Sequence, residues 1–287
     1  MSEQVGSESN GSASAVRSYG DGFVLVDQPR PAVTRVTLNR PDRMNAMAFD
    51  VMVPLRDLLR EIAVDNDTRV VVLTGAGAGF CSGADLVGSG RVPNIDDLTA
   101  TSIARRALQV LDDVILTLRS LHQPVIGAIN GPAIGGGFCL ALATDIRVAG
   151  ESAYFRAAGI NNGLTASELG LSYLLPRAIG SSRAFDIMLS GRDVNAEEAE
   201  RIGIVSRVTA DVDLLDACYE LAERIIGFSR PGIELTKRTL WTSLDASSLA
   251  GHMEYEGISQ LFVRMTTRNF DEAILARKEK RPPVFLD

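Results

Sequence analysis

The sequence predicts an α/β fold with a largely parallel sheet. Within the first 150 residues, apolar runs of strand length alternate more than once with helix-like segments. Such alternation requires crossover connections between parallel strands. Residues 69–74 (RVVVLT) are almost continuously apolar, as expected for a strand that is covered on both faces. From residue 212 onward the pattern is almost wholly helical, so we expect a core over 19–210 and a helical region over 211–287.

The elements of the first half follow from apolar spacing and turn residues. Between about 48 and 64, apolar side chains recur every three or four residues, which predicts a helix. A loop that contains Gly and Pro, ending at about residue 98, separates the third strand from the next helix. The expected strands lie at 23–27, 33–38, 69–74, 124–129 and 144–149, and the expected helices at about 48–64 and 103–121.

The second half is predicted to be mainly helical. A helix that begins at Glu168 is expected to be interrupted near Pro176, whereas Pro231 fits the first turn of its helix. A short strand is expected at 204–208. The expected helices lie at about 168–179, 181–189, 196–202, 212–228, 231–245, 248–266 and 270–278.

The composition of the chain argues against several classes of protein. Residues 1–18 are rich in Ser, Gly and Glu and are expected to form a disordered arm. The net charge of -7 argues against a nucleic-acid partner. No apolar run reaches the roughly 18 residues of a membrane span, and no signal peptide is recognisable. The chain has three widely spaced cysteines and two histidines. We therefore expect a cytoplasmic protein without disulfides or a metal site.

One stretch combines a strand, a tight turn and a helix. Residues 124–129 (PVIGAI) are of buried-strand length, 130–132 (NGP) form a turn, and Gly135, Gly136 and Gly137 precede an apolar helix. Glycine allows a ligand to approach the backbone, and the first amides of a helix lack intrahelical partners. This stretch is therefore either an oxyanion-binding site or a glycine packing point between strand and helix.

Several other features have a functional and a structural interpretation. Residues 75–79 have the spacing G-x-G-x-G, which departs from the dinucleotide fingerprint, and no phosphate-binding Gly-Lys-Ser/Thr follows. Cys81 and Cys139 could be nucleophiles, but a buried thiol is the commoner case. A structural role is favoured for His122 and His252, and Asp145 is expected to be a cap or a buried structural carboxylate.

Glu168 is the candidate acid or base. It follows a polar stretch, 161–167 (NNGLTAS), and precedes an apolar one, 169–175 (LGLSYLL). A carboxylate with apolar neighbours can have a raised pKa and transfer a proton. The alternative is a first-turn glutamate that stabilises a helix start, with Ser167 as the cap.

Three motifs, in this order and at these intervals, resemble the crotonase superfamily of enoyl-CoA hydratases and isomerases. They are residues 38–46 (LNRPDRMNA), 80–86 (FCSGADL) and 130–137 (NGPAIGGG), and 279–285 (EKRPPVF) also matches. The resemblance covers about residues 22–287. The chain is especially similar to actinobacterial enoyl-CoA hydratase paralogues, including 157–164 (AAGINNGL).

The resemblance implies a spiral of ββα units with a C-terminal helical region that forms trimers or dimers of trimers. It implies that the backbone amides of Ala84 and Gly136 bind the thioester oxygen and stabilise an enolate. Coenzyme A, as part of the substrate and not as a separate cofactor, would lie along Arg43 and residues 82–87. The residues of this loop are Ser82, Gly83, Ala84, Asp85, Leu86 and Val87. Lys280 would reach the phosphates, from the same or a neighbouring subunit.

Two departures from the family pattern affect the chemistry. The two glutamates that position water in hydratases of the well-known type are replaced by Cys139 and Gly159. Counting back from 179–180, Glu168 matches the catalytic aspartate of dienoyl-CoA isomerases, whereas counting forward from the glycines gives Ser167. Glu168 is our best single acid or base.

We therefore expect an acyl-CoA enzyme of the enoyl-CoA hydratase type, acting in fatty acid metabolism through a stabilised enolate. Isomerisation by the single carboxylate fits at least as well. A catalytically weak acyl-CoA-binding homologue and a nucleotide-binding α/β protein are the alternatives. Acyl chain length stays open, although four apolar residues are candidates for a pocket: Leu86, Phe138, Leu140 and Phe155.

Overall fold

The computed structural model describes residues 15–286 and confirms the α/β fold class. A seven-stranded sheet has the order β1-β2-β3-β4-β5-β7-β10. Only the β1–β2 and β2–β3 pairs are antiparallel, and the other neighbours run parallel. The strands are β1 (Arg17–Tyr19), β2 (Val24–Arg30), β3 (Val33–Leu38), β4 (Val70–Gly75), β5 (Val125–Ile129), β7 (Ile146–Gly150) and β10 (Arg207–Thr209).

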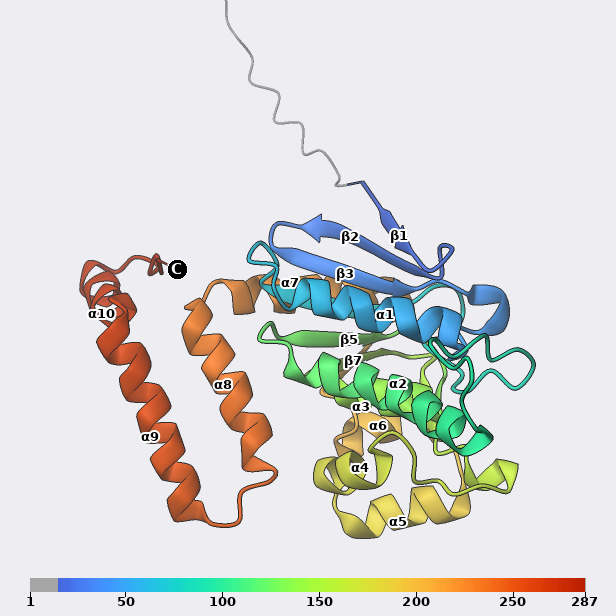
Figure 1. Ribbon diagram of the computed structural model, residues 1–287. Helices are drawn as coiled ribbons and strands as arrows, with labels where there is room; N and C mark the ends of the chain where they lie inside the picture. Colours follow the sequence, from blue (N-terminus) through green and yellow to red (C-terminus); the bar gives the residue numbers. More distant parts are fainter. Residues whose placement is uncertain (1–14, 287) are drawn as a thin grey trace, which may run out of the picture.

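The sheet is covered on both faces (Figure 1). Helices α1 (Phe49–Ile62) and α2 (Ala100–Ser120) lie over one face, and α7 (Leu214–Ile226) lies over the other. Every residue of β4 is buried, as its apolar run predicted. Its side chains alternate: Val71 and Leu73 join the apolar cluster under α1 and α2, whereas Val70 and Val72 join the cluster under α7.

A second, smaller sheet was not predicted. It has the order β6-β8-β9, from β6 (Ala133–Ile134), β8 (Tyr154–Arg156) and β9 (Val194–Asn195). Strands of two or three residues are too short to give a periodic signal. This sheet matters because β6 leads directly into the triple glycine.

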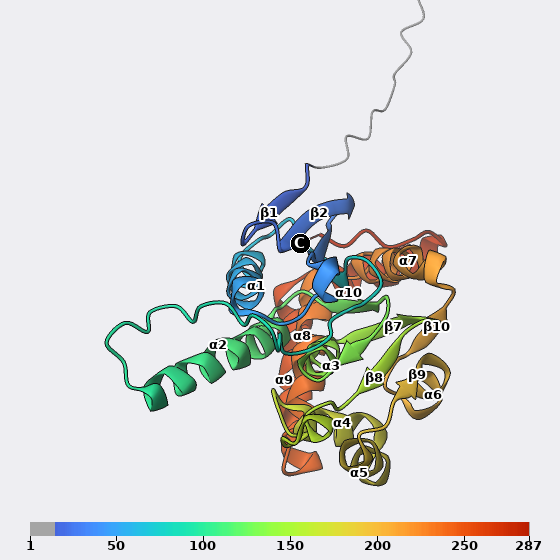
Figure 2. The ribbon, with the colours of Figure 1, turned by 90° about the vertical axis from the view of Figure 1, so that its right-hand side faces the viewer.

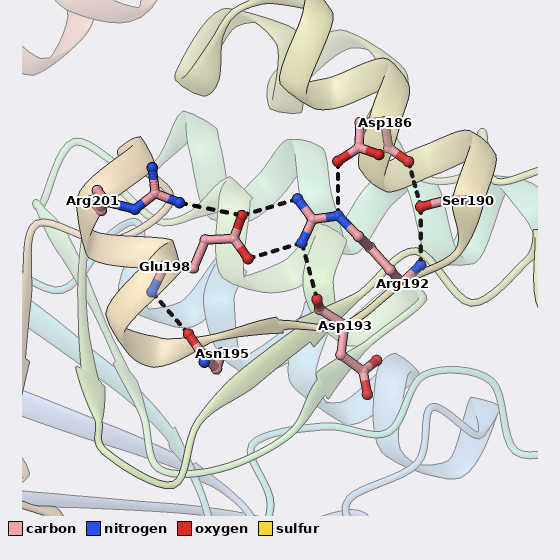
Figure 3. Close-up of polar contacts among 7 residues, drawn as sticks. All are labelled: Asp186, Ser190, Arg192, Asp193, Asn195, Glu198 and Arg201. Atoms are coloured by element: carbon pink, nitrogen blue, oxygen red, sulfur yellow. Dashed lines mark hydrogen bonds and ion pairs between the residues drawn. The ribbon is translucent and has the colours of Figure 1, made fainter.

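An arginine-centred network fixes the edge of the small sheet (Figure 3). Arg192 donates to Asp186 at 2.7 Å and makes two bonds to Glu198, at 2.8 and 2.9 Å. Asp186 belongs to α5 (Ser181–Ser190) and Glu198 to α6 (Ala196–Ile202). Arg156 of β8 also pairs with Asp193. These bonds hold the segment that carries β9 between two helices.

Most of the other predicted elements are present, with shifted ends. The remaining helices are α3 (Gly136–Ala143), α4 (Leu171–Ile179), α8 (Arg230–Ser243), α9 (Leu249–Thr266) and α10 (Asn269–Glu279), and the short 3-10 turns are η1 (Pro41–Arg43), η2 (Ile160–Asn162) and η3 (Asp211–Asp213). Pro231 lies in the first turn of α8, as predicted. No helix in the part of the chain that the structure describes is long and apolar enough to cross a bilayer.

Four expectations were wrong in detail. The disordered arm was placed at 1–18, but Arg17 and Ser18 belong to β1, and residues 1–14 lie outside the described part. The strand expected at 204–208 begins only at Arg207. The helix expected from Glu168 begins at Leu171, because Leu169 and Gly170 have φ of +44° and +84°.

The fourth expectation that was wrong concerns Pro176, which lies inside α4 and does not interrupt it. A proline cannot donate to the carbonyl four residues before it. Here that carbonyl belongs to Ser172, which is exposed, so water can take the place of the missing donor.

The C-terminal helices form an arm beside the sheet (Figures 1 and 2). Helix α9 packs on α8 and has no buried residue. Its exposed large apolar side chains are Leu249, Met253, Ile258, Leu261, Phe262 and Met265.

A buried ion pair attaches the arm to the sheet. Lys237 of α8 donates to Asp145 at 2.8 Å and to the carbonyl of Gln123 at 2.8 Å. Asp145 also accepts from the Val125 amide and from the Trp241 indole, each at 2.6 Å. Asp145 is therefore a structural carboxylate, as expected from the sequence.

We predict that Lys237→Met lowers the free energy of unfolding by about 3 kcal/mol, because removing one partner leaves a buried charge uncompensated. Urea denaturation measures this loss. Lys278→Met on α10, where the lysine is exposed, is the matched control and should change stability by less than about 0.5 kcal/mol. Equal losses in the two variants would contradict the role assigned to the pair.

Candidate active site

Two loops meet at the carboxyl end of the parallel strands. One follows β4 and carries Ala84, and the other follows β5 and leads through β6 into α3. A Cβ atom on Gly83 would lie 2.5 Å from the Ile134 carbonyl oxygen and 3.3 Å from the Gly136 nitrogen. A Cβ atom on Gly137 would lie 2.0 Å from the Cys81 carbonyl oxygen. Only glycine permits backbones to approach this closely.

Two backbone amides at this junction are available as donors. Gly136 is the first residue of α3, so its N–H has no carbonyl partner within the helix. Ala84 forms a parallel bridge with Met47. In this bridge Met47 donates to the Gly83 carbonyl at 2.7 Å and accepts from the Asp85 amide at 3.3 Å. The N–H of Ala84 therefore points away from Met47.

The Asp85 carboxylate holds the Ala84 loop from inside. Its side chain is 1% exposed and lies 2.8 Å from Arg40 and 2.6 Å from Arg43. It also accepts from the amides of Val87 and Gly88 at 2.9 and 3.0 Å. Hydrogen bonds from these amides and from Arg43 hold the pKa of Asp85 well below its usual range.

This arrangement gives Asp85 a structural role within the expected substrate loop. Asp85 was expected to contact substrate, but its carboxylate is occupied by the protein itself. Leu86 and Val87 are 80% and 82% exposed. Arg40, which the sequence analysis did not single out, shares the carboxylate with Arg43. Its position in the LNRP motif was the available signal.

Glu168 lies beside the start of α3. Its Oε1 atom is 3.2 Å from the position that a Cβ on Gly135 would take, next to Gly136. The side chain is partly buried, and desolvation raises its pKa. Within residues 15–286 no group donates a hydrogen bond to the Glu168 carboxylate. The neighbouring Ser167, by comparison, is exposed to solvent. The structure thus brings Glu168, and not Ser167, to this point.

The turn after Glu168 is unusual. Leu169 is a non-glycine residue with φ of +44°, a conformation that costs free energy and often occurs at functional sites. Its Cδ1 lies 3.3 Å from the Cβ position on Gly136, and the sulfur of Met47 lies 2.3 Å from that position. Leu169 and Met47 therefore wall the Gly136 amide, and no pattern in the sequence indicated either.

Cys139 and Gly159, at the positions of the two missing glutamates, have structural roles. The buried Cys139 thiol lies 3.3 Å from the carbonyl oxygens of Gly135 and Glu168, and burial raises its pKa well above the usual value. Burial raises the pKa of Cys81 to about 12. Neither thiol has the character of a nucleophile. A Cβ on Gly159 would lie 2.0 Å from the Thr165 carbonyl oxygen, so no side chain fits there.

The glycine run at 75–79 does not form a phosphate loop. Asn45 donates to the carbonyls of Ala76 and Gly79 at 2.9 and 2.8 Å, and Asn130 donates to the Gly77 carbonyl at 3.0 Å. No helix begins between this run and α2. The run is a folded turn that packs against neighbouring loops, and the dinucleotide alternative loses its support.

The remaining candidates are dispersed. Phe138, Leu140 and Phe155 are completely buried core residues, and Phe138 packs on Phe155 with ring centroids 5.1 Å apart. Lys280 is the C-cap residue of α10, which stands apart from the sheet (Figure 1). The chain on its own does not bring Lys280 to Ala84.

Comparisons with known proteins agree with the family resemblance of the motifs. The family model described as enoyl-CoA hydratase/isomerase matches residues 29–287. A Mycobacterium bovis protein named probable enoyl-CoA hydratase echA12 is 70% identical over 265 residues, or 92% of this chain and 93% of that protein.

Solved structures give the same result. A crystal structure of a probable enoyl-CoA hydratase/isomerase from Mycobacterium abscessus is 67% identical and has a TM-score of 0.88, covering 92% of this chain and 98% of that one. A monofunctional enoyl CoA isomerase from M. smegmatis is 64% identical with a TM-score of 0.69, covering 80% of this chain and 98% of that one. The chain belongs to the enoyl-CoA hydratase/isomerase family and has the crotonase fold.

Proposed function

We propose that this enzyme binds an acyl-CoA thioester and stabilises its enolate with the amides of Ala84 and Gly136. The observation that carries the proposal is the placement of Glu168 beside two donors whose N–H groups have no partner in the local backbone pattern. Donors held in place before reaction stabilise developing negative charge without reorganising. A nearby carboxylate with a raised pKa can transfer the proton.

Isomerisation of the double bond is the reaction that this site supports best. Glu168 takes a proton from C2 of a 3-enoyl thioester, the thioester oxygen becomes an enolate, and the proton returns at C4 to give the 2-enoyl product. One carboxylate suffices for both proton transfers. Gly159 has no room for a second one, and Cys139 is a buried neutral thiol. A relative named as a monofunctional isomerase supports the same conclusion.

Hydration is the second candidate, because several relatives are named as hydratases. It requires a water molecule to be activated by Glu168 alone, which must also supply the α-proton. Binding without turnover, as in a catalytically weak homologue, is the third outcome that an experiment must distinguish.

We also propose how the rest of the substrate and assembly are arranged. Coenzyme A would lie along Arg43 and the loop 82–87, with no separate cofactor. The exposed apolar side chains of α9 support a homotrimer or a dimer of trimers, in which Lys280 of a neighbouring copy could reach the phosphates. We expect a cytoplasmic enzyme.

Glu168→Gln should abolish turnover while leaving acyl-CoA affinity nearly unchanged, because the amide keeps the shape but cannot transfer the proton. Mass spectrometry of 2-enoyl- and 3-enoyl-CoA incubated with enzyme in deuterated water measures the reaction. Deuterium uptake or a shifted double bond indicates isomerisation, and a gain of one water indicates hydration. Glu254→Gln on α9 is the control. Full activity in Glu168→Gln would disprove the assignment.

The pH profile provides an independent test of Glu168. Glu168 acts as a base in its ionised form. We therefore expect kcat/KM to be low at pH values below the pKa of Glu168 and to rise as the pH increases through that pKa. Because burial raises this pKa, the acid limb should lie above the ordinary value of 4.5. An acid limb at or below 4.5 would contradict the environment described for Glu168.

Asp85→Asn should destabilise the protein by about 2 kcal/mol at neutral pH, because two guanidinium groups lose a charged acceptor. The folded-state pKa of Asp85 is depressed. Its contribution is therefore complete above the unfolded pKa of about 3.9 and is lost as the pH falls toward the folded value. Urea denaturation of both proteins from pH 7 to pH 3 should show the difference shrink below about pH 4.

The same substitution should lower kcat more than it raises KM, because the Ala84 amide loses its support. Asp42→Asn, which changes an exposed neighbouring carboxylate, should affect neither stability nor rate. A difference in unfolding free energy that stays constant down to pH 3 would refute the role of the Asp85 charge.

A further inference from the structure

A cavity lies at the opposite end of the parallel strands from the candidate active site. Its volume is about 470 Å³, and its walls are the end of α2, the turn before β5 and one side of α8. Helix α2 ends at Ser120, just before β5 begins. The cavity is therefore at the amino end of the parallel strands, whereas Ala84 and Gly136 follow their carboxyl ends. It has no part in the proposed reaction.

Arg119, which lines this cavity, is stacked on an aromatic ring and has a buried nitrogen without a hydrogen-bond partner. Its guanidinium lies over the Trp241 ring, 4.1 Å from the centroid. The Nε atom is buried and has no hydrogen-bond partner. Among residues 15–286 no carboxylate forms an ion pair with Arg119. The buried Nε–H group has lost hydration that no acceptor of the described chain replaces.

Charges of both signs surround Arg119: the carboxylates of Asp245 and Asp145 and the guanidinium of Arg177 act on it electrostatically. Arg238 lines the same wall and is exposed, and His122 lies 3.7 Å from Glu234, the carboxylate in the lining. Lys237 is already paired with Asp145. Asp245, outside the lining, accepts from the Tyr173 hydroxyl, and Arg177 stacks on that tyrosine with 3.5 Å to the ring centroid.

We propose that this cavity binds the anionic oxygen group of a small molecule, a phosphate or a carboxylate, with Arg119 as its main ligand. A guanidinium that stacks on an aromatic ring keeps its N–H edge free for such oxygens. Arg238 adds a second positive charge at the mouth, and His122 adds a further donor. Binding would give an anionic acceptor to the N–H groups of Arg119 that face the cavity, since the Nε atom itself is buried.

The single tryptophan of the chain makes the site directly observable. Trp241 fluorescence is recorded while inorganic phosphate is added to the full-length protein at constant ionic strength, with sodium chloride as the matched salt. We expect a saturable change with phosphate and none with chloride. Arg119→Gln should weaken phosphate binding about tenfold or more, equivalent to about 1.4 kcal/mol.

Two further variants keep the test decisive. Arg105→Gln changes an exposed arginine on the same helix and should bind phosphate as the unmodified protein does. Arg238→Gln changes an exposed residue, so folding is not at issue, and should weaken binding several-fold. Equal phosphate affinity in all three variants, or a linear response matched by chloride, would overturn the proposal.

A carboxylate from a second copy of the chain is the competing source of the anion. In that case Trp241 fluorescence would change on dilution of the protein, together with its size in light scattering, and phosphate would have no effect. That outcome would also overturn the proposal. Because the readout is binding at Trp241, failure here leaves the proposed isomerase function untouched.

Discussion

The site depends on one constraint, the contact of two backbones at a distance that only glycine allows. The segment 81–84 lies so close to 134–137 that a methyl group on Gly83 or Gly137 would overlap a carbonyl oxygen. Side chains between the two loops would separate the Ala84 and Gly136 amides. With hydrogen in place of the side chains, the loops that follow β4 and β5 can bring the two amides together, which the proposed oxyanion hole requires.

The surroundings keep these two backbones in place. On one side, Asp85 gathers two arginines and two amides and fixes the loop that carries Ala84. On the other side, the Gly135 amide donates to the carbonyl of Arg156 at 2.8 Å, which ties the start of α3 to β8. Strand β8 is tied in turn to β9 and its arginine network. Both amides are thus held in place by the fold itself, as the proposed stabilisation of an enolate requires.

The Glu168 carboxylate belongs to a third segment, the loop between η2 and α4. The Cys139 thiol of α3 lies at hydrogen-bond distance from the carbonyls of Gly135 and Glu168. Helix α3 therefore contacts the loop that carries the Glu168 carboxylate. Leu169 has a strained backbone conformation in this loop, and the Glu168 carboxylate lies close to Gly135. The Leu169 side chain lies beside Gly136, and burial raises the pKa of Glu168.

The sequence by itself determined the order of the elements, the buried parallel strands and the two glycine-containing loops. These features are local: apolar periodicity and turn residues act over a few positions. Ala84, Gly136 and Glu168 could be named in advance, the first two because a resemblance to a known family aligned their motifs. The sequence left open whether Glu168 stabilised a helix start or faced the amides. It also gave no sign of β6, β8 and β9.

Only the tertiary structure decided these points, because they depend on contacts between residues far apart in the chain. Asp85 proved to be an internal support, Phe138 and Phe155 proved to be core, and the helix after Glu168 began three residues later than its apolar pattern suggested. The stacking of Arg119 on Trp241 also depends on the tertiary structure, because α8 places the indole against the end of α2. Periodicity records which face of an element is buried, but the partner that a charged side chain finds, or lacks, is set by the packing of the whole chain.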